Sequence, residues 1–112
     1  MMRSPRMTLQ VQLVLGEMLT QPAEPRYGLD LCAATGLPSG TIYPILARLE
    51  RIEWVVSDWE NPEAHVAEGR PRRRYYQFTR EGAESATEAL QAIQRTRKTW
   101  HTPLPDVSGA GP

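Results

Sequence analysis

The sequence predicts a mainly helical protein with one small β-hairpin, on three observations. Apolar residues recur every three or four positions in four separate segments, which is typical of amphipathic helices. Between the third and fourth segments lie two short runs rich in β-branched and aromatic residues, which favour a hairpin. With 112 residues and a formal net charge of zero, the chain is long enough for one domain with one modest core.

The composition indicates in which cellular compartment the protein is expected. Cys32 is the only cysteine, which excludes an internal disulfide and fits a reducing compartment. No apolar run approaches the roughly 20 residues needed to span a bilayer, and the first residues lack the apolar block of a secretory signal. We therefore expect a soluble, cytoplasmic protein with no membrane partner.

The first predicted helix spans Met7–Leu19 and ends before the Pro-rich segment 21–26. Leu9 and Leu13 widen its apolar stripe beyond one side. The plain interpretation is packing in the core. The more specific interpretation is that a partner subunit packs against the second side.

The second predicted helix is short and covers residues 27–36. Gly36 suits the left-handed position that closes a helix, and Pro38 prevents its continuation. Its expected apolar face is formed by Leu29, Cys32, Ala33 and Gly36.

The third predicted helix, residues 39–53, follows after so short a turn that the pair forms a helix-turn-helix. Its N-cap is either Ser39 or Thr41, a choice that the presence of Pro44 leaves open. One face is apolar: Ile42, Ile45, Leu46, Leu49 and Ile52. The opposite face is small and nearly uncharged at first and then carries arginine, which suits a recognition helix that enters a DNA groove.

The hairpin is predicted from two strands, Trp54–Trp59 and Arg74–Phe78. The polar residues between them, with turn signals at Asn61, Pro62 and Gly69, indicate a mobile tip, which makes the hairpin a wing. The wing carries the densest basic patch of the chain: Arg70, Arg72, Arg73 and Arg74. Strand alternation predicts Arg72 and Arg74 on one side and Arg73 on the other.

The last predicted helix is capped by Thr79 and carries a narrow apolar seam of the kind that pairs with another chain. The seam consists of Ala83, Ala86, Leu90 and Ile93. We therefore expect residues 1–80 to form a DNA-binding domain, 81–100 a dimerisation helix and 101–112 a disordered tail.

The element order α-α-α-β-β-α is that of a winged helix-turn-helix protein. Three blocks, residues 27–31 (YGLDL), 39–50 (SGTIYPILARLE) and 69–82 (GRPRRRYYQFTREG), resemble the signature blocks of the PadR family of bacterial transcriptional regulators. The chain departs from the family at Glu53, where a glycine usually ends the recognition helix. The resemblance implies a homodimeric repressor, without a cofactor, that binds operator DNA. Two-fold symmetry would make that operator palindromic.

The expected DNA contacts come from the start of the third helix, its arginines and the wing. They are Ser39, Gly40, Thr41, Tyr43, Pro44, Arg48, Arg51, Arg70, Arg72, Arg73 and Arg74. The plain alternatives are that Tyr43 packs under the wing and that Arg48 and Arg51 pair with nearby glutamates. In some small members of the family an aromatic residue on the last helix stacks flat drugs, so the resemblance makes Trp100 the candidate contact for a small aromatic effector. Its alternative is interface packing or a frayed helix end.

Catalysis finds no support, because the sequence contains no metal-ligand spacing, phosphate loop or nucleophile elbow. We expect a regulator, not an enzyme. Two rival hypotheses remain. One is a winged-helix module that binds proteins and not DNA, and the other is a sensor of small aromatic ligands.

Overall fold

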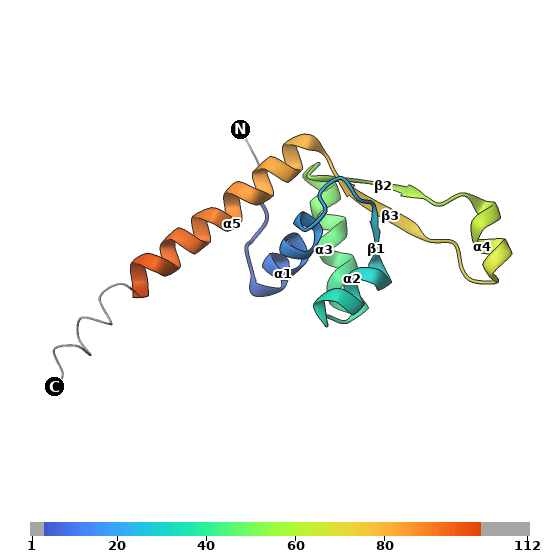
Figure 1. The fold of residues 1–112 in the computed structure, drawn as a ribbon, viewed down its shortest axis with the longest axis horizontal. Helices are drawn as coiled ribbons and strands as arrows, with labels where there is room; N and C mark the ends of the chain where they lie inside the picture. Colours follow the sequence, from blue (N-terminus) through green and yellow to red (C-terminus); the bar gives the residue numbers. More distant parts are fainter. Residues whose placement is uncertain (1–3, 102–112) are drawn as a thin grey trace.

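The computed structural model describes residues 4–101, with side chains described as far as residue 97. The helices and strands follow in the order α1 (Leu9–Leu19), β1 (Arg26–Tyr27), α2 (Gly28–Thr35), α3 (Ser39–Arg51), β2 (Val55–Trp59), α4 (Pro62–Glu68), β3 (Arg74–Phe78) and α5 (Arg80–His101). Helices α1, α2 and α3 form a central body, from which α5 and the β2–β3 hairpin project at opposite ends (Figure 1). The molecule is therefore elongated, with extents of 67 × 34 × 22 Å.

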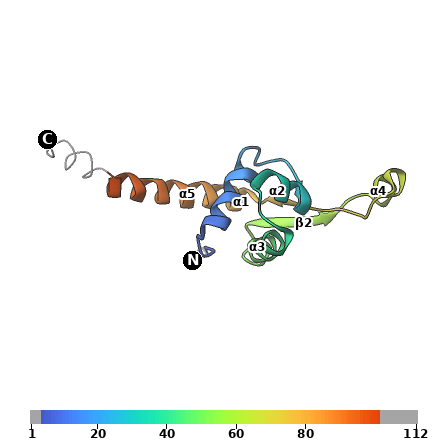
Figure 2. The ribbon, with the colours of Figure 1, turned by 90° about the horizontal axis from the view of Figure 1, so that it is seen from below.

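The helix-turn-helix forms as predicted. Gly36 closes α2 in the left-handed conformation, with φ of 77°, and only three residues separate α2 from α3. Seen end-on beside β2 in Figure 2, α3 runs across the long axis of the molecule. The core side of α3 is apolar as expected, with Ile42, Leu46 and Leu49 fully buried.

Neither predicted cap of α3 is correct. The helix begins at Ser39, and Pro38 takes the N-cap position in extended backbone without a side-chain cap. Its carbonyl accepts from the backbone N–H of Thr41 at 2.9 Å and of Ile42 at 3.0 Å. Pro44 therefore lies inside the helix, where it has no N–H to donate to the Gly40 carbonyl.

The predicted apolar face of α2 is wrong. Leu31 is the fully buried residue, whereas Leu29 is 62% exposed and Ala33 is also exposed. The helix lies close to α3 at Gly28, where an added Cβ would lie 2.4 Å from the Tyr43 ring. Gly28 faces α3, and Leu31, one turn later, faces the core on the same side.

The sheet has three antiparallel strands in the order β1-β3-β2, one more than predicted. The hairpin register pairs Val55 with Phe78 and Trp59 with Arg74. The additional strand, β1, pairs Arg26 with Tyr76 at the edge of β3. Only two residues long and preceded by a Pro-rich segment, it carries no alternating pattern that could have predicted it.

The tip of the wing contains a helix, α4, that was not predicted. Asn61 accepts from the Glu63 N–H at 2.9 Å, and Pro62 occupies the first turn. Gly69 closes the helix in the left-handed conformation, with φ of 65°. These three residues, interpreted as turn signals, are also the signals of a short helix.

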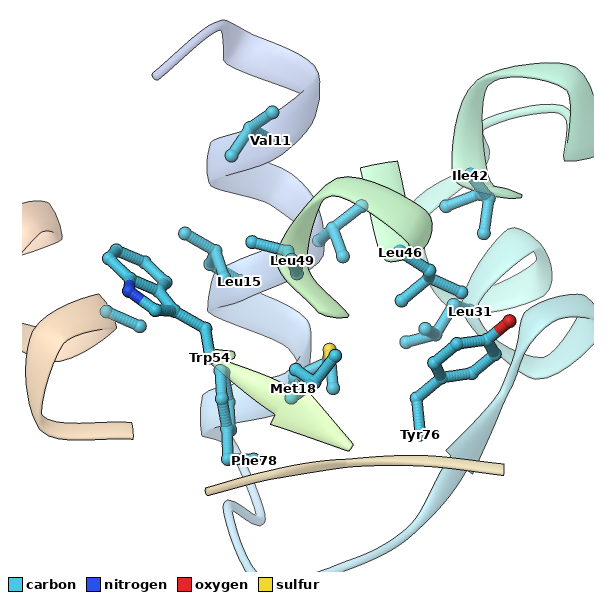
Figure 3. Packing of buried hydrophobic residues seen from close by; sticks show 13 residues of the cluster. Val11, Leu15, Met18, Leu31, Ile42, Leu46, Leu49, Trp54, Tyr76 and Phe78 are labelled. Atoms are coloured by element: carbon cyan, nitrogen blue, oxygen red, sulfur yellow. The ribbon is translucent and has the colours of Figure 1, made fainter. Parts of the chain in front are cut away.

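The hydrophobic core lies where α1, α2, α3 and the sheet meet (Figure 3). Tyr76 lies beside Leu31 and Leu46, and Trp54 is buried, with 4% of its surface exposed. At the edge of the core the buried guanidinium of Arg26 bonds to Glu17 of α1 and to Asp30 of α2. This ion pair network ties α1, β1 and α2 together.

Helix α5 is anchored to the end of α3 through Thr79. The Thr79 hydroxyl accepts from the Gly82 N–H at 2.9 Å, as predicted for a cap, and donates to the Glu53 carbonyl at 3.0 Å. Glu53 keeps the left-handed conformation, with φ of 66°, although it is not a glycine. The helix reaches His101, one residue into the segment predicted as a tail, and residues 102–112 lie outside the described part.

Candidate nucleic-acid interface

The outward face of α3 is open in the single chain. Ser39, Gly40 and Pro44 are exposed, Thr41 is half-buried, and Tyr43 is 42% exposed. The sequence predicted this arrangement from helical periodicity. The Tyr43 ring also packs against Gly28 of α2, whereas the alternative interpretation placed it under the wing.

Arg48 and Arg51 extend the same face toward the end of α3. Both are exposed, and neither forms an ion pair with any residue that the structure describes. The alternative, pairing with nearby glutamates, is not seen among the described residues; Glu50 instead accepts from the Ser57 hydroxyl at 2.6 Å and lies 3.7 Å from Arg74. Two guanidinium groups are thus left facing solvent.

The wing arginines divide between two aromatic rings, as strand alternation predicted. Arg72 and Arg74 lie over Trp59, at 5.7 and 5.3 Å from the ring centroid. Arg73 lies over Tyr27, at 4.0 Å. Trp59 is 49% exposed, so its ring supports two cations at the surface, and cation–π contacts of this kind stabilise by about 0.5–1 kcal/mol at exposed sites.

Arg70 differs from its neighbours because it is held by carboxylates. Its guanidinium contacts Glu60 at 2.5 and 3.0 Å and Glu68 at 2.7 Å. The hydrogen bond from Arg70, together with one from the Arg73 backbone N–H, lowers the pKa of Glu60 to about 2. Glu60 and Glu68 in turn raise the pKa of Arg70. Arg70 holds the two ends of the wing tip together, a role that the run of arginines did not reveal.

Some residues of the predicted seam on α5 lie in or against the core, and others lie at the surface. Ala86 is fully buried within the chain, and Ala83 and Leu90 pack at the edge of the core. Leu90 and Ile93 border a surface groove of about 310 Å³ together with Leu9 and Leu13 of α1. Leu9 is 61% and Leu13 42% exposed, so this second apolar side of α1 is uncovered in one chain.

The remaining predictions concern the effector contact, metal binding and membrane spanning. The side chain of Trp100 lies beyond the described side chains, so its role as an effector contact stays a prediction. Within residues 4–101, the acidic, histidine and cysteine side chains form no group of three that could hold a metal ion. None of the described helices combines the length and apolar character needed to cross a bilayer.

A three-helix body, an exposed second helix of the helix-turn-helix and an arginine-bearing hairpin define a winged helix-turn-helix protein. The chain belongs to the transcriptional regulator PadR-like family, whose sequence model matches residues 17–88. It is therefore a transcriptional regulator and not an enzyme. No curated protein matches the chain.

Solved structures share the fold. A PadR family transcription regulator from Clostridium difficile is 23% identical with a TM-score of 0.67, over 84% of this chain and 97% of that one. A PadR-like regulator from Bacillus cereus is 22% identical with a TM-score of 0.64, over 86% and 91%. The PcaV regulator from Streptomyces coelicolor, solved with its natural ligand, is 22% identical with a TM-score of 0.66, over 91% and 66%.

Proposed function

We propose that this protein is a homodimeric repressor that binds palindromic operator DNA. The start of α3 enters the major groove, and Arg72, Arg73 and Arg74 of the wing follow the neighbouring backbone. Two copies of α3 about 34 Å apart, one turn of the duplex, would read the two half-sites. Repression follows when the bound dimer blocks access to the promoter.

The observation that carries this proposal is the exposed face of α3. It is narrow at its N-terminal end, where backbone N–H groups are available to a phosphate. It then carries two arginines, Arg48 and Arg51, that have no ion pair among the described residues. A solvated face without a partner would have its charges paired along the helix, whereas here Glu50 points to the wing.

The electrostatic part of the proposal is tested by the salt dependence of DNA binding. Arg48, Arg51, Arg72 and Arg73 have no ion pair among the described residues, which would give about eight phosphate contacts in a dimer. The slope of log K against log salt concentration is then about −7, at −0.9 per phosphate. The measurement is fluorescence anisotropy of a labelled duplex selected from a random pool.

Single variants make the test specific. Arg48→Gln and Arg73→Gln should each reduce the steepness of the slope by about 1.8 in a dimer, because each removes two phosphate contacts. Arg80→Gln is the matched control, since the Arg80 side chain is 88% exposed on α5, and it should leave the slope unchanged. Salt-independent binding, or no binding to duplex DNA, would favour the protein-binding module instead.

The dimer is proposed to form through α1 and α5 together. Helix α5 has 22 residues, and beyond Leu90 its described side chains are exposed apart from the half-buried Ile93. Leu9 and Leu13 lie next to it, so a second copy would cover Leu9, Leu13, Leu90 and Ile93 together with the glutamines between them. Such a surface is larger than the seam of α5 alone.

Leu13→Glu combined with Ile93→Glu should convert the dimer to a monomer and abolish high-affinity operator binding. Sedimentation equilibrium measures the mass. Val66→Glu is the control, because Val66 is 69% exposed on the wing tip, away from this surface. A double variant that remains a dimer would refute this interface.

A further inference from the structure

The hairpin of β2 and β3 projects from the helical body (Figure 1), and Arg72 lies in it between α4 and β3. Its side chain forms no ion pair with any residue that the structure describes. An arginine in solvent samples many rotamers, and fixing one of them on binding costs free energy. A contact that already restricts Arg72 in the free protein would therefore strengthen its binding to an anion.

The ring of Trp59 provides such a contact. The guanidinium carbon of Arg72 lies 5.7 Å from the centroid of this ring, and Arg72 Nε donates to the Glu60 carbonyl at 3.0 Å. These two contacts leave both Nη groups without a hydrogen-bond partner among the described residues. A guanidinium that stacks on an aromatic ring keeps such N–H groups available for a phosphate.

Trp59 is in turn connected to α3 through Arg74. The sheet register pairs these two residues directly, and the Arg74 guanidinium lies 5.3 Å from the Trp59 ring centroid. Arg74 Nε donates to the Ser57 hydroxyl at 3.0 Å, and an Nη group lies 3.7 Å from the Glu50 carboxylate of α3. An unbroken series of contacts therefore joins α3, through Arg74 and Trp59, to Arg72.

Packing in the core does not explain a tryptophan at position 59. The side chain is 49% exposed and is not a member of the core cluster. Two roles remain for an exposed ring beside two cations. It acts through the arginines, or it contacts DNA itself.

We propose that Trp59 is a positioning residue, whose ring fixes the Arg72 guanidinium relative to α3 so that the wing and the recognition helix meet the duplex together. This inference rests on the proposed function, because the anion that Arg72 meets is a DNA phosphate. Trp59 carries no charge and neutralises no phosphate. It therefore changes the strength of DNA binding but not its salt dependence.

The test uses the full chain and fluorescence anisotropy of a labelled duplex selected from a random pool, at several salt concentrations. Trp59→Leu should weaken binding about tenfold at each concentration, from about threefold per wing in a dimer, with an unchanged slope. Trp59→Phe keeps a ring and should retain most of the affinity. Arg72→Gln should instead reduce the steepness of the slope by about 1.8.

Val56→Thr is the matched control on the same strand. Val56 is 55% exposed, and strand alternation places it on the other face of β2 from Trp59. This variant should bind the duplex as the unmodified protein does.

A double-mutant cycle separates the two roles of Trp59. If the ring acts through Arg72, adding Trp59→Leu to Arg72→Gln should cost less than about twofold in affinity, because the group that it positions is gone. A further tenfold loss in the Arg72→Gln background would mean that Trp59 contacts DNA directly, which would overturn the proposal.

The contact is also measured without DNA, by NMR of the unmodified protein. The ring current of Trp59 should place the δ-methylene protons of Arg72 upfield of those of Arg80, whose side chain is 88% exposed on α5. Equal shifts for the two arginines, or unchanged duplex affinity in Trp59→Leu, would refute the positioning role and leave the proposed function intact. If the unmodified protein binds no duplex at all, both proposals fail, so the two failures are distinguishable.

Discussion

Gly82 is the position where a single added methyl group should have the largest effect on stability. A Cβ at Gly82 would lie 1.9 Å from the carbonyl oxygen of Trp54 and 2.6 Å from its Cα. Both are backbone atoms, so the strain cannot be relieved by a side-chain rotation. The start of α5 would have to move away from β2 and lose the Thr79 bonds to Glu53 and Trp54.

The expected change in the free energy of unfolding is the difference between two opposing contributions. Overpacking costs about 1–3 kcal/mol, and the upper end applies because backbone must shift. Replacing a helical glycine by alanine recovers up to about 1 kcal/mol. Gly82→Ala should therefore lower the free energy of unfolding by about 2 kcal/mol, which corresponds to a fall in Tm of roughly 10 °C.

Urea unfolding followed by circular dichroism measures this loss. Gly16→Ala is the matched control, because a Cβ at Gly16 in the middle of α1 meets no atom within 4 Å. It should raise the free energy of unfolding by up to about 1 kcal/mol. If Gly82→Ala proves as stable as Gly16→Ala, the close approach of α5 to Trp54 is not what requires glycine.

Three further predictions follow from charged residues. Glu53→Gly should raise the free energy of unfolding by about 1 kcal/mol in urea titrations, because a non-glycine residue at φ of 66° is strained. Arg26→Met should lower it by about 2 kcal/mol in the same assay, below the usual cost of breaking a buried ion pair because Glu17 and Asp30 are about one-third exposed. The pKa of Glu60 is lowered from 4.5 to about 2 in the folded state, so its contribution to stability is complete above pH 4.5 and is lost as the pH falls toward 2. Urea unfolding between pH 2 and 6 should show a shallower acid dependence in Glu60→Gln.

A helix face or a strand could be predicted from the sequence where its residue pattern is compatible with only one structure. The apolar face of α3 and the strand Arg74–Phe78 were predicted correctly, because α3 buries residues at helical spacing and the strand buries alternate residues, Tyr76 and Phe78. The apolar face of the second helix was predicted wrongly: Leu31 and not Leu29 is buried, and the helix packs through Gly28 against the Tyr43 ring. Local patterns do not contain contacts between residues so far apart in the chain.

The arginines of the wing show the same limit of what the sequence can predict about charged residues. A run of arginines predicts a cationic patch, but it does not tell which members are held by carboxylates. Glu60 holds Arg70 and Glu50 lies beside Arg74, and both glutamates come from segments distant in sequence. The first pairing depends on how the hairpin folds, and the second on how the hairpin packs against α3.

A net charge of zero is therefore compatible with a DNA-binding surface. Some acidic residues form ion pairs with arginines that hold the fold together, such as Arg26 in the body and Arg70 in the wing. Four described arginines without an ion pair to an acidic residue lie on the two elements that a winged-helix regulator would present to DNA: Arg48 and Arg51 on α3, and Arg72 and Arg73 on the wing. The distribution of unpaired guanidinium groups, rather than the sum of charges, is the quantity that the salt dependence of binding will measure.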